Sequence, residues 1–228
     1  MRTYVVAISL LTACGGSDLD PGSGNDPGAG NGTLVVDGTA RAEPRVSNAL
    51  VASDFDTEFE VRVQLQGVDV TTGSVVVTSE SGAFELTLSD QRWRGSSPRY
   101  DEVYLLDVVN GEDTVEGVRV DGPDIHSFVD PLPGATVDAT LPLEIQWTGD
   151  RGAVSASIDA DEIDTVAISD SGTFSLAPGS LKTDSDKARE NTLRLTRNNL
   201  IVPAGAAAGS EWRVSIRNEI QVLAAPAP

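Results

Sequence analysis

Residues 55–65 read Phe55-Asp-Thr-Glu-Phe-Glu-Val-Arg-Val-Gln-Leu65, and this stretch decides the fold class. Apolar residues Phe59, Val61, Val63 and Leu65 recur at every second position, with charged or polar residues between them. Successive side chains of a β-strand point to opposite faces of its sheet. The pattern therefore predicts a strand with one buried face and one solvated, acidic face.

The same alternation recurs along most of the chain from Leu34 onward. Short alternating runs are separated by turn signals such as Thr72-Gly73, Ser81-Gly82 and Asn110-Gly111. No window shows helical periodicity over three turns, so we predict an all-β protein. The expected strands lie at 34–36, 55–65, 75–77, 84–88, 103–109, 118–120, 143–147, 154–158, 166–168, 174–176, 193–195, 212–216 and 220–222.

A stretch rich in proline and glycine, from Gly122 to Gly134, interrupts the strand pattern. It predicts one domain over 33–122, a linker over 123–134 and a second domain over 135–225. Val76–Leu86 and Val166–Leu176, offset by 90 residues, share Val, two Ser, Gly, Phe and Leu at equal spacing. That period suits a duplicated sandwich domain of about 100 residues. Two hairpins that merely share turn chemistry are the alternative.

The start of the second domain has a proline-led entry, Pro133-Gly134, followed by a strand that carries Trp147. This opening resembles extracellular immunoglobulin-like and fibronectin-like repeats. The resemblance implies two tandem Ig-like β-sandwich domains. We expect Trp147, and Trp212 on a late strand, to be core residues.

A short apolar run from Tyr4 to Leu11 follows Arg2 and ends in Leu11-Thr12-Ala13-Cys14, which contains the only cysteine. Such a run is too short to span a bilayer, which needs about 20 apolar residues. A basic start, an apolar core and a small residue before a cut are the parts of a secretory signal.

The motif ending at Cys14 resembles the lipobox of bacterial lipoproteins. The resemblance implies that residues 1–13 are a signal peptide and that Cys14 becomes the lipidated residue, with palmitate among its acyl chains. It implies a lipid anchor in the cell envelope of a Gram-negative bacterium. In the enteric lipoproteins that the motif resembles, an aspartate after the cysteine retains the protein at the inner membrane. Gly15 stands at that position here, so the resemblance implies the outer membrane.

Residues 14–32 are expected to be a lipid-anchored flexible tether. From Gly15 to Gly32 the chain has almost no apolar side chain to bury, which predicts disorder. A flexible glycine-rich chain of this length has a root-mean-square reach of roughly 20–25 Å.

We predict no enzyme and no cofactor. His126 is the only histidine, no Gly-x-Ser-x-Gly elbow is present, and we expect His126 to pack in the linker. One histidine and one cysteine do not make a zinc site. Calcium needs only oxygen ligands. The weak candidates for a calcium site are Asp159, Asp161, Glu162 and Asp164. Asp124 and Asp130 are a further option, at a site between the domains. A solvated acidic loop is the favoured interpretation of that cluster.

The chain contains 35 acidic and 16 basic residues, a net charge of −19. So acidic a protein repels nucleic acid, so we expect none as a partner. The expected function is a structural, adhesive or partner-binding role at the cell surface, toward a protein or a glycan. The alternative is a carbohydrate- or ligand-binding module that uses Trp93 and Tyr100. An exposed Trp93 beside Tyr100 would favour this alternative, and a buried Trp93 would count against it.

Overall fold

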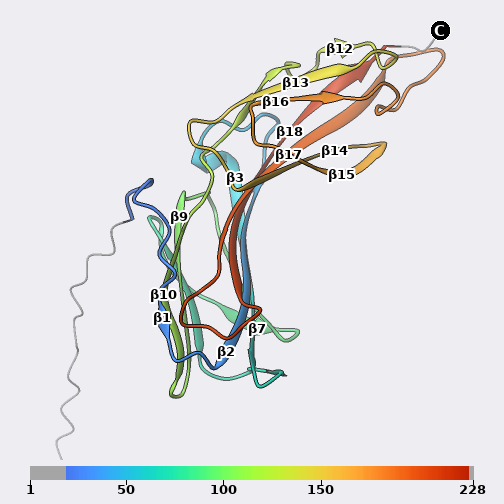
Figure 1. Ribbon diagram of the computed structural model, residues 1–228. Helices are drawn as coiled ribbons and strands as arrows, with labels where there is room; N and C mark the ends of the chain where they lie inside the picture. Colours follow the sequence, from blue (N-terminus) through green and yellow to red (C-terminus); the bar gives the residue numbers. More distant parts are fainter. Residues whose placement is uncertain (1–18, 226–228) are drawn as a thin grey trace, which may run out of the picture.

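The computed structural model describes residues 19–225, which form a long, bent molecule of two lobes (Figure 1). Strands make up the regular structure of this range, apart from the short 3-10 turn η1 (Ala52–Asp54), so the all-β prediction is confirmed. None of the described residues belongs to a helix long and apolar enough to cross a membrane. Cys14 and the expected signal peptide lie outside the described range.

Lobe 1, the lower part of Figure 1, is a sandwich of two sheets. One sheet has the strand order β1-β10-β9-β5-β6, and the other is the part β18-β2-β3-β8-β7 of a ten-stranded sheet. The strands of this lobe are β1 (Ala29–Gly30), β2 (Leu34–Pro44), β3 (Phe55–Leu65), β4 (Val68–Asp69), β5 (Ser74–Ser79), β6 (Gly82–Glu85), β7 (Thr87–Ser89), β8 (Arg92–Ser97), β9 (Val103–Asn110) and β10 (Asp113–Asp121).

Lobe 2, the upper part, places a three-stranded sheet, β11-β13-β16, against the other end of the ten-stranded sheet, β15-β14-β17-β18. The short β12 pairs in parallel with the end of β18. The strands are β11 (Ser127–Asp130), β12 (Thr136–Val137), β13 (Leu143–Thr148), β14 (Ser155–Ala160), β15 (Ile163–Ile168), β16 (Thr173–Leu176), β17 (Arg189–Ile201) and β18 (Glu211–Ala224).

The long β17–β18 hairpin runs through both lobes and joins them (Figure 1). Trp212, Val214 and Ile216 at the start of β18 belong to the apolar cluster of lobe 1. Ile220 and Val222, further along the same strand, belong to the cluster of lobe 2. The structure thus differs from the expected tandem arrangement, because lobe 1 is completed by residues 211–216, which pair with β2.

The first half of the segment expected to be a linker, residues 123–128, belongs to the folded interior, whereas most of 129–134 is exposed. Residues 121–124 and His126 are buried, and the chain then enters β11. The two similar sequences, Val76–Leu86 and Val166–Leu176, also form different strand pairings. β5 and β6 form a hairpin, whereas β15 pairs with β14 and β16 pairs with β13. Shared turn chemistry is therefore enough to account for the similar sequences.

Residues 20–32, called the strap below, are ordered where the sequence predicted a flexible tether. The strap runs along β10, and β1 within it pairs with residues 115 and 116. Asp121 Oδ2 accepts the N–H groups of Gly22 at 2.8 Å and Gly24 at 2.9 Å. A Cβ on Gly28 would lie 2.3 Å from the Glu116 carbonyl oxygen, so the glycine permits close approach. The strap is ordered without apolar side chains because its backbone pairs with β10.

Candidate functional site

Polar side chains occupy core positions where the two lobes meet. Along β17 the buried positions 193 and 195 are leucines, and the next inward position is Arg197, with a side chain only 2% exposed. Along β18 the alternation of Trp212 to Val222 is interrupted by Asn218, which is fully buried. Both residues lie between the two apolar clusters.

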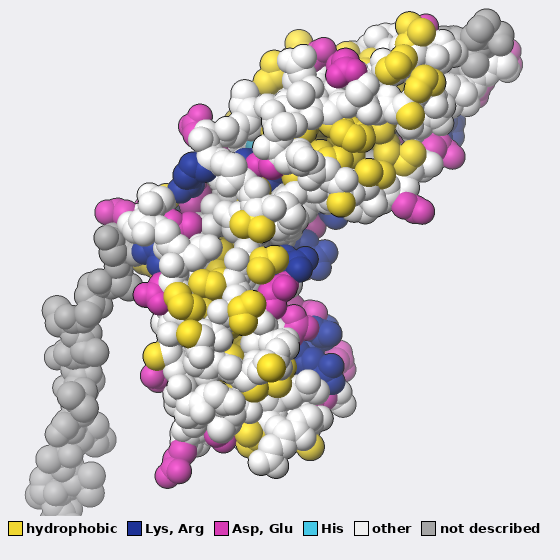
Figure 2. All heavy atoms as spheres, viewed as in Figure 1, with side chains coloured by type: hydrophobic (Ala, Val, Ile, Leu, Met, Phe, Trp, Pro, Cys, Tyr) yellow, Lys and Arg dark blue, Asp and Glu magenta, His cyan; other side chains and the backbone are white. Residues whose placement is uncertain are grey.

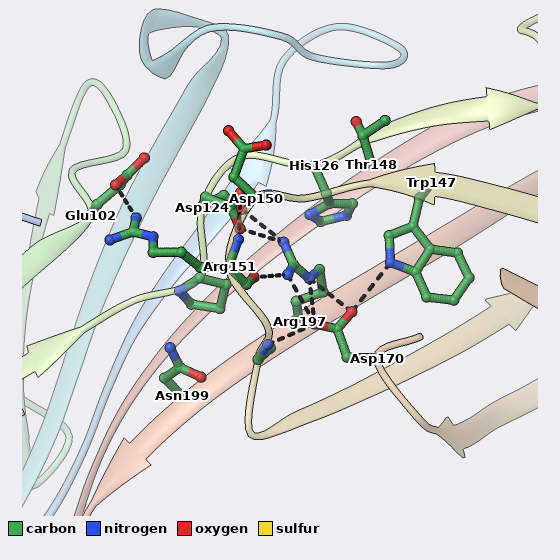
Figure 3. Close-up of polar contacts among 12 residues, drawn as sticks. Glu102, Asp124, His126, Trp147, Thr148, Asp150, Arg151, Asp170, Arg197 and Asn199 are labelled. Carbon is green, nitrogen blue, oxygen red and sulfur yellow. Dashed lines mark hydrogen bonds and ion pairs between the residues drawn. The ribbon is translucent and has the colours of Figure 1, made fainter. Parts of the chain in front are cut away.

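The Arg197 guanidinium uses every nitrogen it has (Figure 3). Its Nε donates to Asp170 Oδ1 at 3.0 Å, and its Nη2 donates to Asp170 Oδ2 at 2.9 Å. Its Nη1 donates to Asp124 Oδ1 at 2.8 Å and to the Asp124 carbonyl at 3.1 Å. Nη2 also donates to the carbonyl of Arg151. We call Asp124, Arg151, Asp170 and Arg197 the junction cluster.

The two carboxylates of the junction cluster have further donors. Asp170 accepts from the Trp147 indole N–H at 3.2 Å and from the Ala153 N–H at 2.6 Å. Burial raises the pKa of Asp170, but the hydrogen bonds from Arg197 and Ala153 outweigh it and leave that pKa below its ordinary value. Asp124 Oδ2 accepts the N–H groups of Asp150 and Arg151. Asp170 therefore stays ionised opposite Arg197, and Asp124 is held beside it by two backbone donors.

Arg151 connects the junction cluster to lobe 1. Its guanidinium pairs with Glu102, which lies just before β9, while its backbone carbonyl faces Arg197 (Figure 3). Gly149 leaves room for the Arg197 guanidinium, because a Cβ at position 149 would lie 2.6 Å from Arg197 Nη1. The loop at 149–153 therefore links the two lobes through side-chain and backbone contacts.

His126 is fully buried beside this cluster. Its Nε2 lies 3.1 Å from the Leu195 carbonyl and must carry the proton in order to donate to it. Burial, helped by the positive charge of Arg197, lowers the pKa of His126 to about 4. The imidazole is thus neutral at pH 7 and packs in the junction, so the expected packing role agrees with its position.

Two asparagines fasten the other side of the junction. Asn218 donates to the carbonyls of Ala49 at 2.9 Å and His126 at 2.7 Å, and it accepts the Ala49 N–H. Asn48 accepts the N–H of Phe128 at 2.8 Å and donates to its carbonyl. The 45–51 loop of lobe 1 is therefore bonded directly to β11 of lobe 2.

The polar groups of this site bond one another and hold the two lobes together. A pocket of about 200 Å³ opens beside Trp147, Gly172 and Arg197, but the charged groups at its floor already bond one another. Within residues 19–225 no group of three His, Cys, Asp or Glu side chains is arranged to bind a metal ion. The junction cluster therefore positions the two lobes and offers no free acid, base or nucleophile.

The expected ligand-contact residues are placed in the core. Trp93 is 7% exposed and Tyr100 is 1% exposed, and both belong to the apolar cluster of lobe 1. The Tyr100 hydroxyl donates to the Pro123 carbonyl. Trp93 follows the inward alternation of β8, so its polar neighbours Arg92 and Arg94 face outward and pair with Glu60. This burial counts against the carbohydrate-binding alternative.

The calcium candidates are engaged with cations of the protein. Arg194 lies 3.1 Å from Asp159 and 3.7 Å from Asp161, and Lys182 lies 3.7 Å from Glu162. Asp164 is exposed on β15. Three of the four carboxylates are therefore distributed around two cationic side chains, and the fourth lies apart on β15, so the set does not converge on a shared centre. Trp147 and Trp212 are 5% and 0% exposed, so their expected core positions are confirmed.

The junction residues were missed at the level of sequence, although a signal was present. Arg197 continues the period-two row of Leu193 and Leu195, and Asn218 continues the row of Val214 and Ile216. A charged or amide side chain at an inward position must be hydrogen-bonded. Such a residue in the middle of a long strand therefore indicates a polar contact between two cores.

No known protein family model matches this chain, and no curated protein matches it.

Proposed function

We propose that this chain is a non-enzymatic, lipid-anchored protein of the bacterial cell envelope that acts as a rigid β-spacer for a partner-binding lobe. The anchor rests on the lipobox resemblance at Cys14, and the outer membrane is the proposed location. The observation that carries the spacer role is the continuity of the β17–β18 hairpin through both lobes.

The junction supports rigidity. A hinge between lobes needs a segment with few contacts, whereas here the shared hairpin is flanked by the Arg197 contacts on one side and the Asn218 contacts on the other. Removing one partner of a buried, hydrogen-bonded ion pair costs about 3–5 kcal/mol. Bending at this point would break several such contacts together.

The strap supports a short anchor. The Asp20 carbonyl accepts from Arg119 at 2.7 Å, and Asp121 holds Gly22 and Gly24, so the strap begins at the junction end of β10. The chain between Cys14 and Asp20 extends at most about 20 Å. A lipid on Cys14 would therefore tether the molecule at the junction between the two lobes and hold it close to the membrane surface.

Lipid labelling tests the anchor. Cells expressing the full-length chain are fed an alkyne analogue of palmitate and separated into membrane and soluble fractions. The wild type and the control variant Ser17→Ala are expected to be labelled and membrane-bound. Cys14→Ala is expected to lose the label and enter the soluble fraction. Equal labelling and fractionation of Cys14→Ala and wild type would overturn the anchor.

A distance measurement tests the spacer. With Cys14→Ala as background, spin labels are placed at Val68→Cys in lobe 1 and Leu141→Cys in lobe 2, two exposed positions on the different lobes. Pulsed electron resonance is expected to give one narrow distance distribution. Arg197→Met, which removes the charged contacts but keeps the chain volume, is expected to broaden it. A broad distribution in the otherwise unchanged protein would contradict a rigid spacer.

A further inference from the structure

The sandwich of lobe 2 has one strand fewer on one side than on the other. The sheet β11-β13-β16 has three strands, and the part of the ten-stranded sheet that faces it has four, β15-β14-β17-β18. β11 lies against β18 at one side, so the shortfall falls at the other side, beside β16. Figure 2 shows an apolar patch between the positions of β16 and β15.

Exposure of inward-facing side chains confirms the shortfall. Ile158 on β14 is fully buried, and its cross-strand partner Val166 on β15 faces the same side yet is 41% exposed. The side chains of Ile163, Ile168 and Phe174 pack against the cluster of lobe 2 but are only partly buried. Directly opposed residues share a face, so these side chains belong to a core that is not covered.

Within residues 19–225, no strand pairs with the outer edge of β16, which lies next to this uncovered core. Trp147 N–H donates to the Gly172 carbonyl at 3.0 Å, and the pairing of β13 with β16 continues from there in register. Backbone groups alternate along an antiparallel ladder. Those of Phe174 therefore face β13, and those of Thr173 and Ser175 face away from it. The Thr173 carbonyl already accepts the Ser171 hydroxyl at 3.0 Å and has one lone pair left for a further donor.

The other edges of lobe 2 carry features that discourage pairing. β11 ends in Asp130-Pro131, and β15 carries Asp164 and a bulge opposite Asp159. Charges, prolines and bulges are the usual protection of an edge strand. β16 reads Thr173-Phe-Ser-Leu176 and has no charge, proline or bulge. Its edge is the open one.

We propose that lobe 2 binds an extended polypeptide segment of a partner, which adds a fourth strand to β16 and covers Val166 and Phe174. The segment would alternate apolar side chains, facing the core, with lysine or arginine, facing outward. This inference names the partner class for the binding role proposed above and rests on that role. Strand addition supplies main-chain hydrogen bonds, and the alternate side chains supply selectivity.

The charge of the surrounding strands determines the choice of occupant. Between residues 143 and 181 the only basic residue is Arg151, and the nearby Lys182, Arg194 and Arg197 pair with carboxylates of the same region. The acidic residues in the same range are Glu144, Asp150, Asp159, Asp161, Glu162, Asp164 and Asp170. Glu144 and Asp164 form no ion pair with any of residues 19–225. A second copy, with its own net charge of −19, would be repelled, whereas a basic strand is attracted.

Peptide binding tests the proposal on the full-length chain carrying Cys14→Ala. The probe is a fluorescent eight-residue peptide of alternating valine and lysine, followed by anisotropy. One comparison peptide has the same composition in two blocks, and a second alternates valine with glutamate. Ser175→Pro removes an edge N–H without removing a bond to β13. Val166→Glu places a charge in the gap, and Val202→Glu, at a 62% exposed site, is the matched control.

The alternating lysine peptide is expected to bind, and both comparison peptides at least about tenfold more weakly. Ser175→Pro and Val166→Glu are expected to weaken binding about tenfold or more, and Val202→Glu less than about twofold, with circular dichroism confirming folded variants. Equal binding of the block peptide, or no effect of Ser175→Pro, would overturn the proposal. So would sedimentation showing a dimer that Ser175→Pro dissociates. The assay contains no lipid, so its failure is separate from a failure of the anchor.

Discussion

Lobe 1 buries the inward residues of its central strands, whereas lobe 2 leaves the inward face of its edge strand β15 partly exposed. In lobe 1 the strap continues the first sheet with β1, and the inward residues of its central strands, such as Phe59 and Val77, are buried. In lobe 2 the inward residue Val166 is 41% exposed. The same strand pattern thus forms one lobe that is extended by the strap and one lobe whose core is partly exposed, on the side proposed to bind a partner.

The largest expected effect is that of separating the lobes. Arg197→Ala leaves Asp170 and Asp124 without their cation, so we expect the free energy of unfolding to fall by about 4–5 kcal/mol, the upper part of the range for a broken buried ion pair. Urea denaturation followed by tryptophan fluorescence measures it. Arg194→Ala, which removes part-exposed pairs on the same strand, is the control and is expected to cost about 1 kcal/mol or less. Equal losses would mean that the junction cluster has no special role.

Truncation of a matched residue in each lobe tests the comparison directly. Phe59→Ala in lobe 1 removes a side chain that is 1% exposed and is expected to cost about 3–4 kcal/mol. Phe174→Ala in lobe 2 removes a half-buried ring and is expected to cost less than half as much. Thermal and urea unfolding of both variants give the two values. A Phe174→Ala loss as large as that of Phe59→Ala would show that lobe 2 is packed as tightly as lobe 1.

The buried histidine makes the junction sensitive to acid. Because the folded pKa of His126 is about 4 and the unfolded value is near 6.5, only the unfolded chain takes up the proton between these pH values. Stability contributed by the neutral ring is therefore complete above about pH 6.5 and falls as the pH drops toward 4, by about 2–3 kcal/mol. Unfolding measured from pH 7 to 4.5 is expected to show this slope, and His126→Gln is expected to remove most of it. An unchanged slope would contradict a buried neutral histidine.

The sequence predicted the parts of this fold that depend on local pattern. The alternation of Phe55 to Leu65 matches β3 residue for residue, because a half-buried strand needs nothing beyond its own period. The continuity of β18 was hidden by Asn218, whose buried position shows only when the row from Trp212 to Val222 is followed through it. The buried position of Trp93 was not evident from the sequence, because its neighbours are arginines, which face the opposite side of β8.

Features that depend on distant residues were not predictable. The glycines of the strap indicated disorder because Asp121, which holds Gly22 and Gly24, lies almost 100 positions away. The open side of lobe 2 depends on how many strands each sheet contains, and no local pattern encodes that number. Composition describes a segment in isolation. The order of the strap and the open side of lobe 2 both depend on contacts with residues that are distant in the sequence.

The smallest expected effect concerns the strap, which extends the first sheet of lobe 1. Asp121→Asn keeps the shape of the side chain but weakens its bonds to Gly22, Gly24 and Arg119, so we expect a global loss of only about 1–2 kcal/mol. Locally the strap is expected to open more often, and hydrogen exchange at the amides of 22–30 is expected to speed up about tenfold while β3 keeps its protection. Asp37→Asn, on the exposed face of β2, is the control and is expected to change neither rate. If exchange in the strap is already fast in the unaltered protein, the strap is not held stably against β10, and the short anchor proposed for Cys14 becomes a long free tether.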